Sequence, residues 1–136
     1  MVRIYSSGFS SLAFSSLDLT RLHSSLRWNQ GNTYSYDYNT WISQIQLAVA
    51  GGIDGFALNL GADSSQVNGL DLAYQAAAGS GTGFKMFLSL DMTVFGCSSY
   101  GHADILKSLV SKFAGHSNQA KYASKVLVGT FAGSDW

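Results

Sequence analysis

The stretch that decides the fold is Gly55-Phe56-Ala57-Leu58-Asn59-Leu60-Gly61, an apolar run that stops at a turn. Short apolar runs bounded by glycine are typical of buried β-strands. Two later runs have the same character, at residues 84–91 and 125–131, and helix-like segments separate the three runs. Strands that alternate with helices pair in parallel, and such proteins carry their chemistry at the carboxyl ends of the strands. We therefore search the edge that follows each run.

Three segments have the apolar periodicity of helices. The first spans residues 39–50 and ends at Gly51-Gly52, and the others carry apolar stripes within residues 67–77 and 105–113. The order is thus α-β-α-β-α-β, and right-handed crossovers place all three strand ends on one edge. A closed (β/α)8 barrel needs about 250 residues. We expect an α/β fold with three to four βα units of a partial TIM barrel and parallel strands.

The composition favours a folded chain with a neutral partner. Hydrophobic residues make up 46% of the chain, charged residues make up 12%, and the net charge is +0. The basic residues are scattered, which argues against nucleic-acid binding. No apolar run reaches the roughly 20 residues of a membrane span. A low charge with 13% aromatic residues suits a sugar better than an ion.

Three residue types limit the chemistry. The eight acidic residues are all aspartate, so the sequence contains no glutamate. Cys97 is the single cysteine, which excludes an internal disulfide. His23, His102 and His116 lack the spacing of metal ligands, so we predict no metal site.

Residues 1–30 differ from the rest of the chain. They are rich in serine and leucine, and the serines interrupt a weak helical face and compete for the backbone. We expect an irregular or poorly ordered N-terminal segment at residues 1–30 and one α/β unit at residues 31–136. No secretory signal peptide is visible, because the first residues lack a continuous apolar region.

From residue 31 onward, several motifs occur in an order that is similar to one known family. They are Gly31-Asn32-Thr33-Tyr34-Ser35-Tyr36, Trp41, Ala50-Gly51-Gly52-Ile53-Asp54-Gly55-Phe56-Ala57-Leu58-Asn59, Ala73-Tyr74-Gln75-Ala76-Ala77, Thr82-Gly83-Phe84-Lys85, Ser89-Leu90-Asp91-Met92 and Thr130-Phe131-Ala132-Gly133-Ser134. Together they resemble the fungal α-1,3-glucanases (mutanases) of glycoside hydrolase family 71, in the N-terminal part of the catalytic domain.

The resemblance implies a (β/α)8 barrel, endo-hydrolysis of α-1,3-glucan with inversion, no cofactor, and an extracellular or cell-wall location. The family places its acid/base pair in a Trp-Asn-Asp-x-Gly-Glu-Ser segment, which this sequence lacks. The family's apolar first strand is also replaced, at residues 22–30, by a stretch that does not have a strand pattern. We therefore expect a fragment that is inactive alone.

Five residues are candidates for the site at the carboxyl edge. Asp91 and Asp63 are candidate supporting carboxylates, and Asn59, Tyr34 and Trp136 are candidate substrate contacts. A carboxylate can hydrogen-bond a glucosyl hydroxyl, and an aromatic ring can stack on the apolar face of a pyranose.

Structural alternatives exist for these residues and for the whole chain. Asp91 and Asp63 could cap turns or helices, and Asn59 could bond a neighbouring strand. Asp54 precedes its strand, so we expect it at the opposite edge and exclude it as catalytic. The alternative functions are a non-catalytic glucan-binding remnant and a small flavodoxin-like α/β interaction domain.

Overall fold

The computed structural model describes most of the chain from residue 31 onward. The described residues are 3–4, 31–33, 35–61, 64–95 and 100–133. Of the candidate site residues, Asn59 and Asp91 are among them, whereas Tyr34, Asp63 and Trp136 lie outside the described residues.

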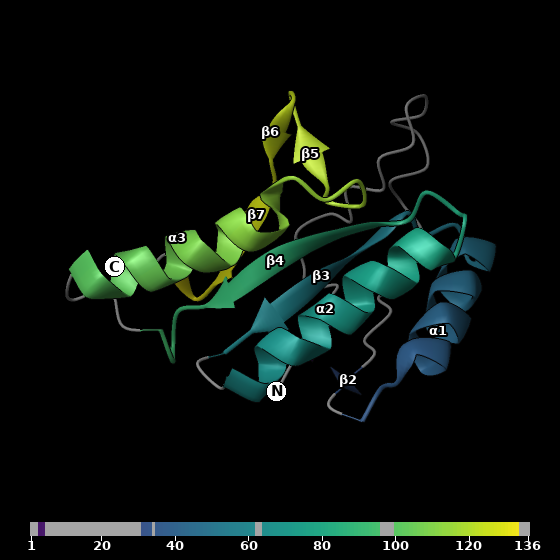
Figure 1. Ribbon diagram of the computed structural model, residues 1–136, viewed down its shortest axis with the longest axis horizontal. Coiled ribbons are helices and arrows are strands. Elements are labelled where there is room, and N and C mark those ends of the chain that lie inside the picture. The colour runs from purple at the N-terminus through teal and green to yellow at the C-terminus, as the bar shows by residue number, and fades with distance from the viewer. Residues whose placement is uncertain (1–2, 5–30, 34, 62–63, 96–99, 134–136) are drawn as a thin grey trace.

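Three helices occur in the described residues, as the apolar periodicity predicted (Figure 1). They are α1 Tyr38–Ala50, α2 Ser64–Gly79 and α3 Tyr100–Ala114. Helix α1 begins where the Asp37 carboxylate accepts a hydrogen bond from the Thr40 N–H at 2.7 Å, which satisfies a donor of the first turn. No helix in the described ranges is long and apolar enough to cross a bilayer.

Five of the described strands form a mixed sheet with the order β2-β1-β3-β4-β7 (Figure 1). Strands β3 Gly55–Leu60, β4 Lys85–Asp91 and β7 Val128–Phe131 run parallel, which confirms the α/β class. Strands β1 Arg3–Ile4 and β2 Gly31–Asn32 add an antiparallel edge beside β3. The sequence did not predict β1, which lies in the segment expected to be irregular, because a two-residue strand has no periodicity to detect.

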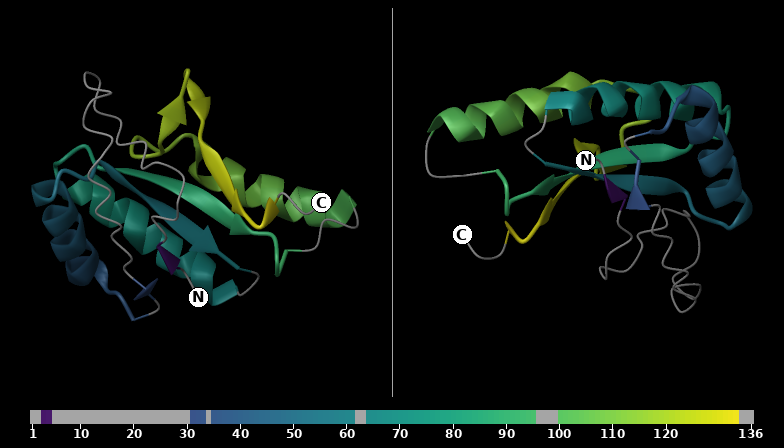
Figure 2. Two further views of the ribbon diagram at one scale, coloured as in Figure 1. Left: turned by 180° about the vertical axis from the view of Figure 1, so that it is seen from behind. Right: turned by 90° about the horizontal axis from the view of Figure 1, so that it is seen from below.

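The two faces of the sheet have different environments. In β4 the side chains of Met86, Leu88 and Leu90 are buried, and the alternate side chains of Phe87 and Ser89 are half-buried. This period of two indicates that one face packs against the core. The right panel of Figure 2 shows α2 and α3 over one face, and α1 packs beside α2. We call the face that carries Phe87 and Ser89 the open face.

The core lies between the helices and the covered face of the sheet. Its cluster includes Trp41 of α1 and Tyr74 of α2, both at most 1% exposed. Tyr74 stacks on Phe113 of α3 with ring centroids 4.4 Å apart, and Phe56 meets Phe84 edge to face at 4.7 Å. The first contact joins α2 to α3, and the second joins β3 to the residue that precedes β4.

A short excursion interrupts the strand that lies beside β4. Gln119 pairs in parallel with Met86, and Val128 pairs with Leu88. In an uninterrupted strand the residue opposite Leu88 would be residue 121, because residues advance in step along both strands. Residues 121–127 are therefore inserted between two pieces of one strand path.

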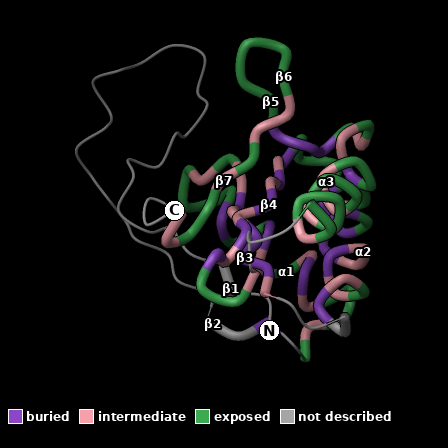
Figure 3. Tube along the Cα trace, turned by 90° about the vertical axis from the view of Figure 1, so that its left-hand side faces the viewer, coloured by how far each residue is buried: buried purple, intermediate pink, exposed green. Residues whose placement is uncertain are grey.

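The inserted residues form a hairpin of β5 Lys121–Tyr122 and β6 Lys125–Val126, which is exposed in Figure 3. The Leu127 N–H donates to the Ala120 carbonyl at 2.9 Å and closes the base of the hairpin. The predicted strand at residues 125–131 is therefore wrong at its start, since Lys125–Val126 belongs to the hairpin. The apolar run continues across the boundary, so composition alone does not mark it.

Candidate functional site

Polar side chains lie together on the open face at the carboxyl ends of the parallel strands. Asn59 is opposite Ser89, and Ser89 is opposite Gly129. Asp91 is opposite Phe131. Register partners share a face of the sheet, and so do alternate residues along a strand. An amide, a hydroxyl, a carboxylate and an aromatic ring therefore share this part of the open face.

Asn59 is the most unusual residue of this group. Its side chain is 3% exposed, and its Oδ1 atom has no hydrogen-bond partner among the described residues. Leaving a buried acceptor unpaired costs about 1–3 kcal/mol. The structural alternative, a bond to a neighbouring strand, is not seen for this oxygen in the described part of the chain. Asn59 therefore keeps a buried acceptor whose hydrogen-bonding capacity is unused among the described residues.

Asp91 has a structural role in the turn that follows β4. Its Oδ1 accepts hydrogen bonds from the Thr93 N–H at 3.0 Å and from the Thr93 hydroxyl at 2.6 Å. Its carbonyl accepts from the Phe95 N–H at 3.0 Å. The carboxylate thus has the turn-capping role that the sequence offered as an alternative. It stays half-buried at the carboxyl edge, where a second role toward a ligand is compatible with its position.

The amino ends of the strands contain a separate hollow of about 500 Å³. Its lining includes Gly55, Lys85, Phe87 and His116. Asp54 also lines it, and the Asp54 carbonyl accepts from the Lys85 N–H at 2.9 Å, which places this aspartate at the expected, opposite edge. We take the carboxyl edge as the candidate site, because parallel α/β proteins carry their catalytic residues at that edge. The hollow at the amino ends does not change this choice.

Two shifted pKa values have structural causes. Hydrogen bonds from Thr40 lower the pKa of Asp37, the residue that caps α1. Burial raises the pKa of Tyr74, so its hydroxyl remains protonated and donates to Gln119 Oε1 at 2.6 Å. In the described ranges, no group of three or more His, Cys, Asp or Glu side chains could hold a metal ion.

Comparison with known proteins identifies the family of this chain. Residues 27–136 match the model of the family described as Glycosyl hydrolase family 71. The chain belongs to glycosyl hydrolase family 71. This confirms the resemblance drawn from the sequence motifs. No solved structure matches the chain.

Three curated relatives of this family 71 chain are fungal proteins. Glucan endo-1,3-alpha-glucosidase agn1 of Schizosaccharomyces pombe is 47% identical over 103 residues, which are 76% of this chain and 23% of that protein. Ascus wall endo-1,3-alpha-glucanase of the same species is 39% identical over 105 residues, 77% of this chain and 24% of the relative. Mutanase Pc12g07500 of Penicillium rubens is 32% identical over 107 residues, 78% of this chain and 23% of the relative. The chain spans about a quarter of the length of these relatives.

Sequence reasoning missed two residues at the carboxyl edge of the family 71 chain. Ser89 reaches it through the register of the sheet, which a sequence without pairing information does not specify. Gln66 lies in α2 and its Oε1 accepts from the Gly61 N–H at 2.7 Å, which fixes the turn after β3. A glutamine shortly after the turn that follows a strand was the available signal for this last contact.

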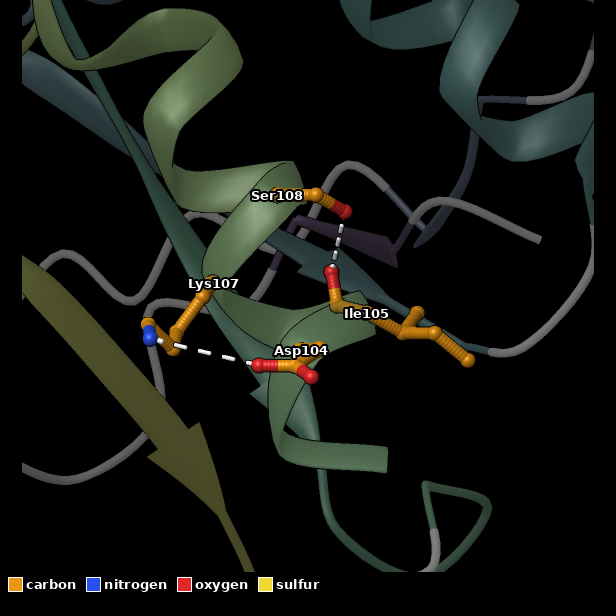
Figure 4. Close-up of polar contacts among 4 residues, drawn as sticks. All are labelled: Asp104, Ile105, Lys107 and Ser108. Atoms are coloured by element: carbon orange, nitrogen blue, oxygen red, sulfur yellow. Dashed lines mark hydrogen bonds and ion pairs between the residues drawn. The ribbon is translucent and has the colours of Figure 1, made fainter. Parts of the chain in front are cut away.

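Figure 4 shows two local contacts near the start of α3. Lys107 and Asp104 approach to 3.9 Å, and both side chains are largely exposed. The Ser108 hydroxyl donates to the Ile105 carbonyl at 2.8 Å. Such exposed contacts contribute little to stability, and they add no group to the candidate site.

Proposed function

We propose that this chain forms part of the glucan-binding edge of an α-1,3-glucanase-like glycoside hydrolase. Membership of family 71 and the names of the three relatives support α-1,3-glucan as its partner. The reaction proposed for such an enzyme is endo-hydrolysis with inversion. The relative named for the ascus wall supports an extracellular or cell-wall location.

The observation that carries the proposal is the unpaired Oδ1 of buried Asn59 on the open face. A sugar hydroxyl is a neutral donor that would satisfy this acceptor at no cost in charge burial. Ser89, its register partner, would add a second hydroxyl contact. Asp91 would act as a supporting carboxylate, and we keep Asp63, Tyr34 and Trp136 as further candidates outside the described residues.

We also propose that the α/β unit is part of a (β/α)8 barrel, with the open face toward its interior. Parallel pairing of β3, β4 and β7 supports this, as does the position of α2 and α3 over one face. A flavodoxin-like domain carries helices on both faces of its sheet. The core cluster contains none of the open-face residues Ala57, Phe87 and Ser89, which favours the barrel.

We propose that the 136-residue chain alone does not hydrolyse α-1,3-glucan. An inverting glycosidase needs a general acid and a general base about 6.5–9.5 Å apart. The sequence contains no glutamate, and Thr93 already occupies one oxygen of Asp91. Reducing sugar released by the wild type should equal that released by the Asp91→Ala variant. Release well above this variant would contradict the proposal of inactivity.

Sedimentation with insoluble α-1,3-glucan tests the binding proposal. We expect the wild-type chain to sediment with the polymer and the Asn59→Ala variant to bind about tenfold more weakly, because one hydrogen bond from the ligand is lost. Asn68→Ala, the same change at an exposed position of α2, is the matched control and should bind like the wild type. Starch, an α-1,4-linked glucan, tests the linkage.

Two outcomes separate the alternatives. Binding without reducing-sugar release favours the non-catalytic glucan-binding remnant for the isolated chain. Equal sedimentation of the wild type and Asn59→Ala would show that Asn59 does not contact the glucan. Equal binding to starch and to α-1,3-glucan would show that the chain does not select the α-1,3 linkage.

A further inference from the structure

The open face of the sheet carries a glycine beside the polar residues of the candidate site. Gly129 lies inside β7 opposite Ser89, and Ser89 lies opposite Asn59 of β3. The three residues therefore form one row across the three parallel strands. Glycine inside a strand weakens the strand, and it often marks a place where a ligand approaches the backbone closely.

Neither the backbone nor the described neighbours require glycine at position 129. Gly129 is not among the described glycines with a positive φ, so its backbone conformation suits other residues. A Cβ atom on Gly129 would lie 3.4 Å from Phe87 Cε2 and 3.8 Å from both Cβ and Oγ of Ser89, which are ordinary van der Waals distances. Alanine would therefore fit in the described structure.

Gly55 of β3 shows what a packing requirement looks like in the same sheet. A Cβ atom there would lie 2.5 Å from the Lys85 carbonyl oxygen, so any side chain would displace backbone. At Gly129 the three nearest atoms all belong to side chains on the same face of the sheet. What glycine provides at position 129 is therefore room above the open face rather than a special conformation.

The side chains around this room suit a sugar ring. Phe131, two residues along β7 on the same face, is 40% exposed, and Phe87 is half-buried on the other side. An aromatic ring offers an apolar face for stacking. The Ser89 hydroxyl can donate or accept a hydrogen bond, and the Asp91 carboxylate next to it on β4 can accept one. A neutral ring with hydroxyl groups at its edge matches this combination.

We propose that Gly129 forms the floor of a subsite that holds one glucosyl ring of α-1,3-glucan. The ring would fill the space above Gly129, with its apolar face against Phe131 and a hydroxyl group bonded to Ser89. Strands β3 and β7 are two spacings of about 4.8 Å apart, so Asn59 would contact a neighbouring glucosyl unit of the same glucan chain. This inference rests on the proposed function and adds the residue that determines whether the ring fits.

The substitution Gly129→Ala separates an effect on the fold from an effect on the ligand. Without glucan, Tm should stay equal to that of the wild type or rise by roughly 2–4 °C, because alanine loses less chain entropy than glycine in a strand. In sedimentation with insoluble α-1,3-glucan, the same variant should bind about tenfold more weakly, because its methyl group occupies the place of the ring. Gly129→Val should weaken binding further.

Gly115→Ala is the matched control. A Cβ atom at this position meets no atom within 4 Å, and Gly115 lines the hollow at the amino ends rather than the proposed subsite. This variant should sediment with the glucan like the wild type. Ser89→Ala, which removes the hydroxyl beside the ring, should weaken binding.

The outcomes that overturn the subsite are distinct from failure of the proposed function. A lower Tm for Gly129→Ala would mean that the protein itself uses the space and would overturn the inference. Wild-type sedimentation of Gly129→Ala, or an equal loss for Gly115→Ala, would also overturn it. If the wild type binds, Asn59→Ala binds weakly and Gly129→Ala binds like the wild type, the subsite alone is wrong. If the wild type does not sediment, the proposed function fails and the subsite fails with it.

Discussion

The amino and carboxyl ends of the parallel strands are built in different ways. At the amino ends, side chains and backbone join neighbouring segments: Asn118 Nδ2 donates to the Phe84 carbonyl at 2.8 Å, and the Met86 N–H donates to the Asn118 carbonyl at 2.8 Å. At the carboxyl ends, buried Asn59 keeps an oxygen without a described partner. The difference is consistent with the proposal that the carboxyl ends of the strands face the ligand.

The largest effect expected on stability comes from Gly55→Ala at the amino end of β3. A Cβ atom at this position would lie 2.5 Å from the Lys85 carbonyl oxygen, and backbone cannot move aside as a flexible side chain can. We expect a loss of about 3 kcal/mol, at the upper end of overpacking costs. Chemical denaturation of the variant measures this loss.

Gly115→Ala is the matched control for that experiment. A Cβ atom there meets no atom within 4 Å, so the substitution should change stability little. An unfolding free energy for Gly55→Ala within 0.5 kcal/mol of the control, roughly the scatter of surface substitutions, would show that the amino ends are not closely packed.

The next effect concerns the hydrogen bonds of Gln119. Its Oε1 accepts from the Tyr74 hydroxyl at 2.6 Å, and its Nε2 donates to the Ala120 and Leu127 carbonyls, each at 3.0 Å. It thereby fastens both ends of the hairpin to α2. Tyr74→Phe leaves a buried acceptor unpaired and should cost about 2 kcal/mol.

Tyr122→Phe, which removes a hydroxyl from an exposed tyrosine of the hairpin, provides a comparison for Tyr74→Phe. The prediction can be checked by thermal unfolding of both variants. If Tyr74→Phe were as stable as the wild type, the Gln119 contacts would not contribute to the fold.

A smaller effect, in the stabilising direction, is expected at the tip of the hairpin. Ala123 and Ser124 have φ values of 48° and 64°, in the left-handed region where side chains other than Gly and Asn are disfavoured. Replacing them by Asn-Gly should stabilise the chain by about 1 kcal/mol and raise Tm by roughly 4 °C. The backbone of this turn is therefore strained, unlike the well-bonded backbone at the amino ends of the strands.

Differential scanning calorimetry measures the change at the turn. Ala78→Gly, at an exposed position of α2, is the control, because glycine in a helix lowers stability where no positive φ is relieved. A lower Tm for the Asn-Gly variant would contradict the turn geometry.

The sequence predicted those parts of the fold that depend on local pattern. The strands at residues 55–60 and 85–91 and the helix that begins near residue 38 followed from apolar runs, caps and glycines. The hairpin did not, because Val126-Leu127-Val128 is one apolar run although only its last residue enters β7. A boundary of this kind is set by pairing with distant residues.

The sequence likewise predicted the residues of the candidate site that lie at strand ends, but not the features that depend on strand pairing. The rule that strand ends carry chemistry selected Asn59 and Asp91, and the structure places both on the open face at the carboxyl edge. Ser89 required the register, in which it is opposite Asn59. The sequence also did not show that the Asn59 oxygen lacks a partner, since this depends on what surrounds it in three dimensions.

The smallest effect on stability is expected for Asn59→Leu at the carboxyl ends, and its comparison with Asn118→Leu at the amino ends is the sharpest test of the difference between the two ends. Asn59→Leu removes an unpaired buried oxygen, so its unfolding free energy should stay within about 1 kcal/mol of the wild type and should tend to increase. Asn118→Leu removes a buried amide that bonds the Phe84 carbonyl and should cost about 2 kcal/mol. In sedimentation with α-1,3-glucan, the larger effect should come from Asn59→Leu, which loses binding, whereas Asn118→Leu should bind like the wild type. Equal destabilisation by the two substitutions would mean that Asn59 serves the fold, and the distinction between the two ends would then fail at its main residue.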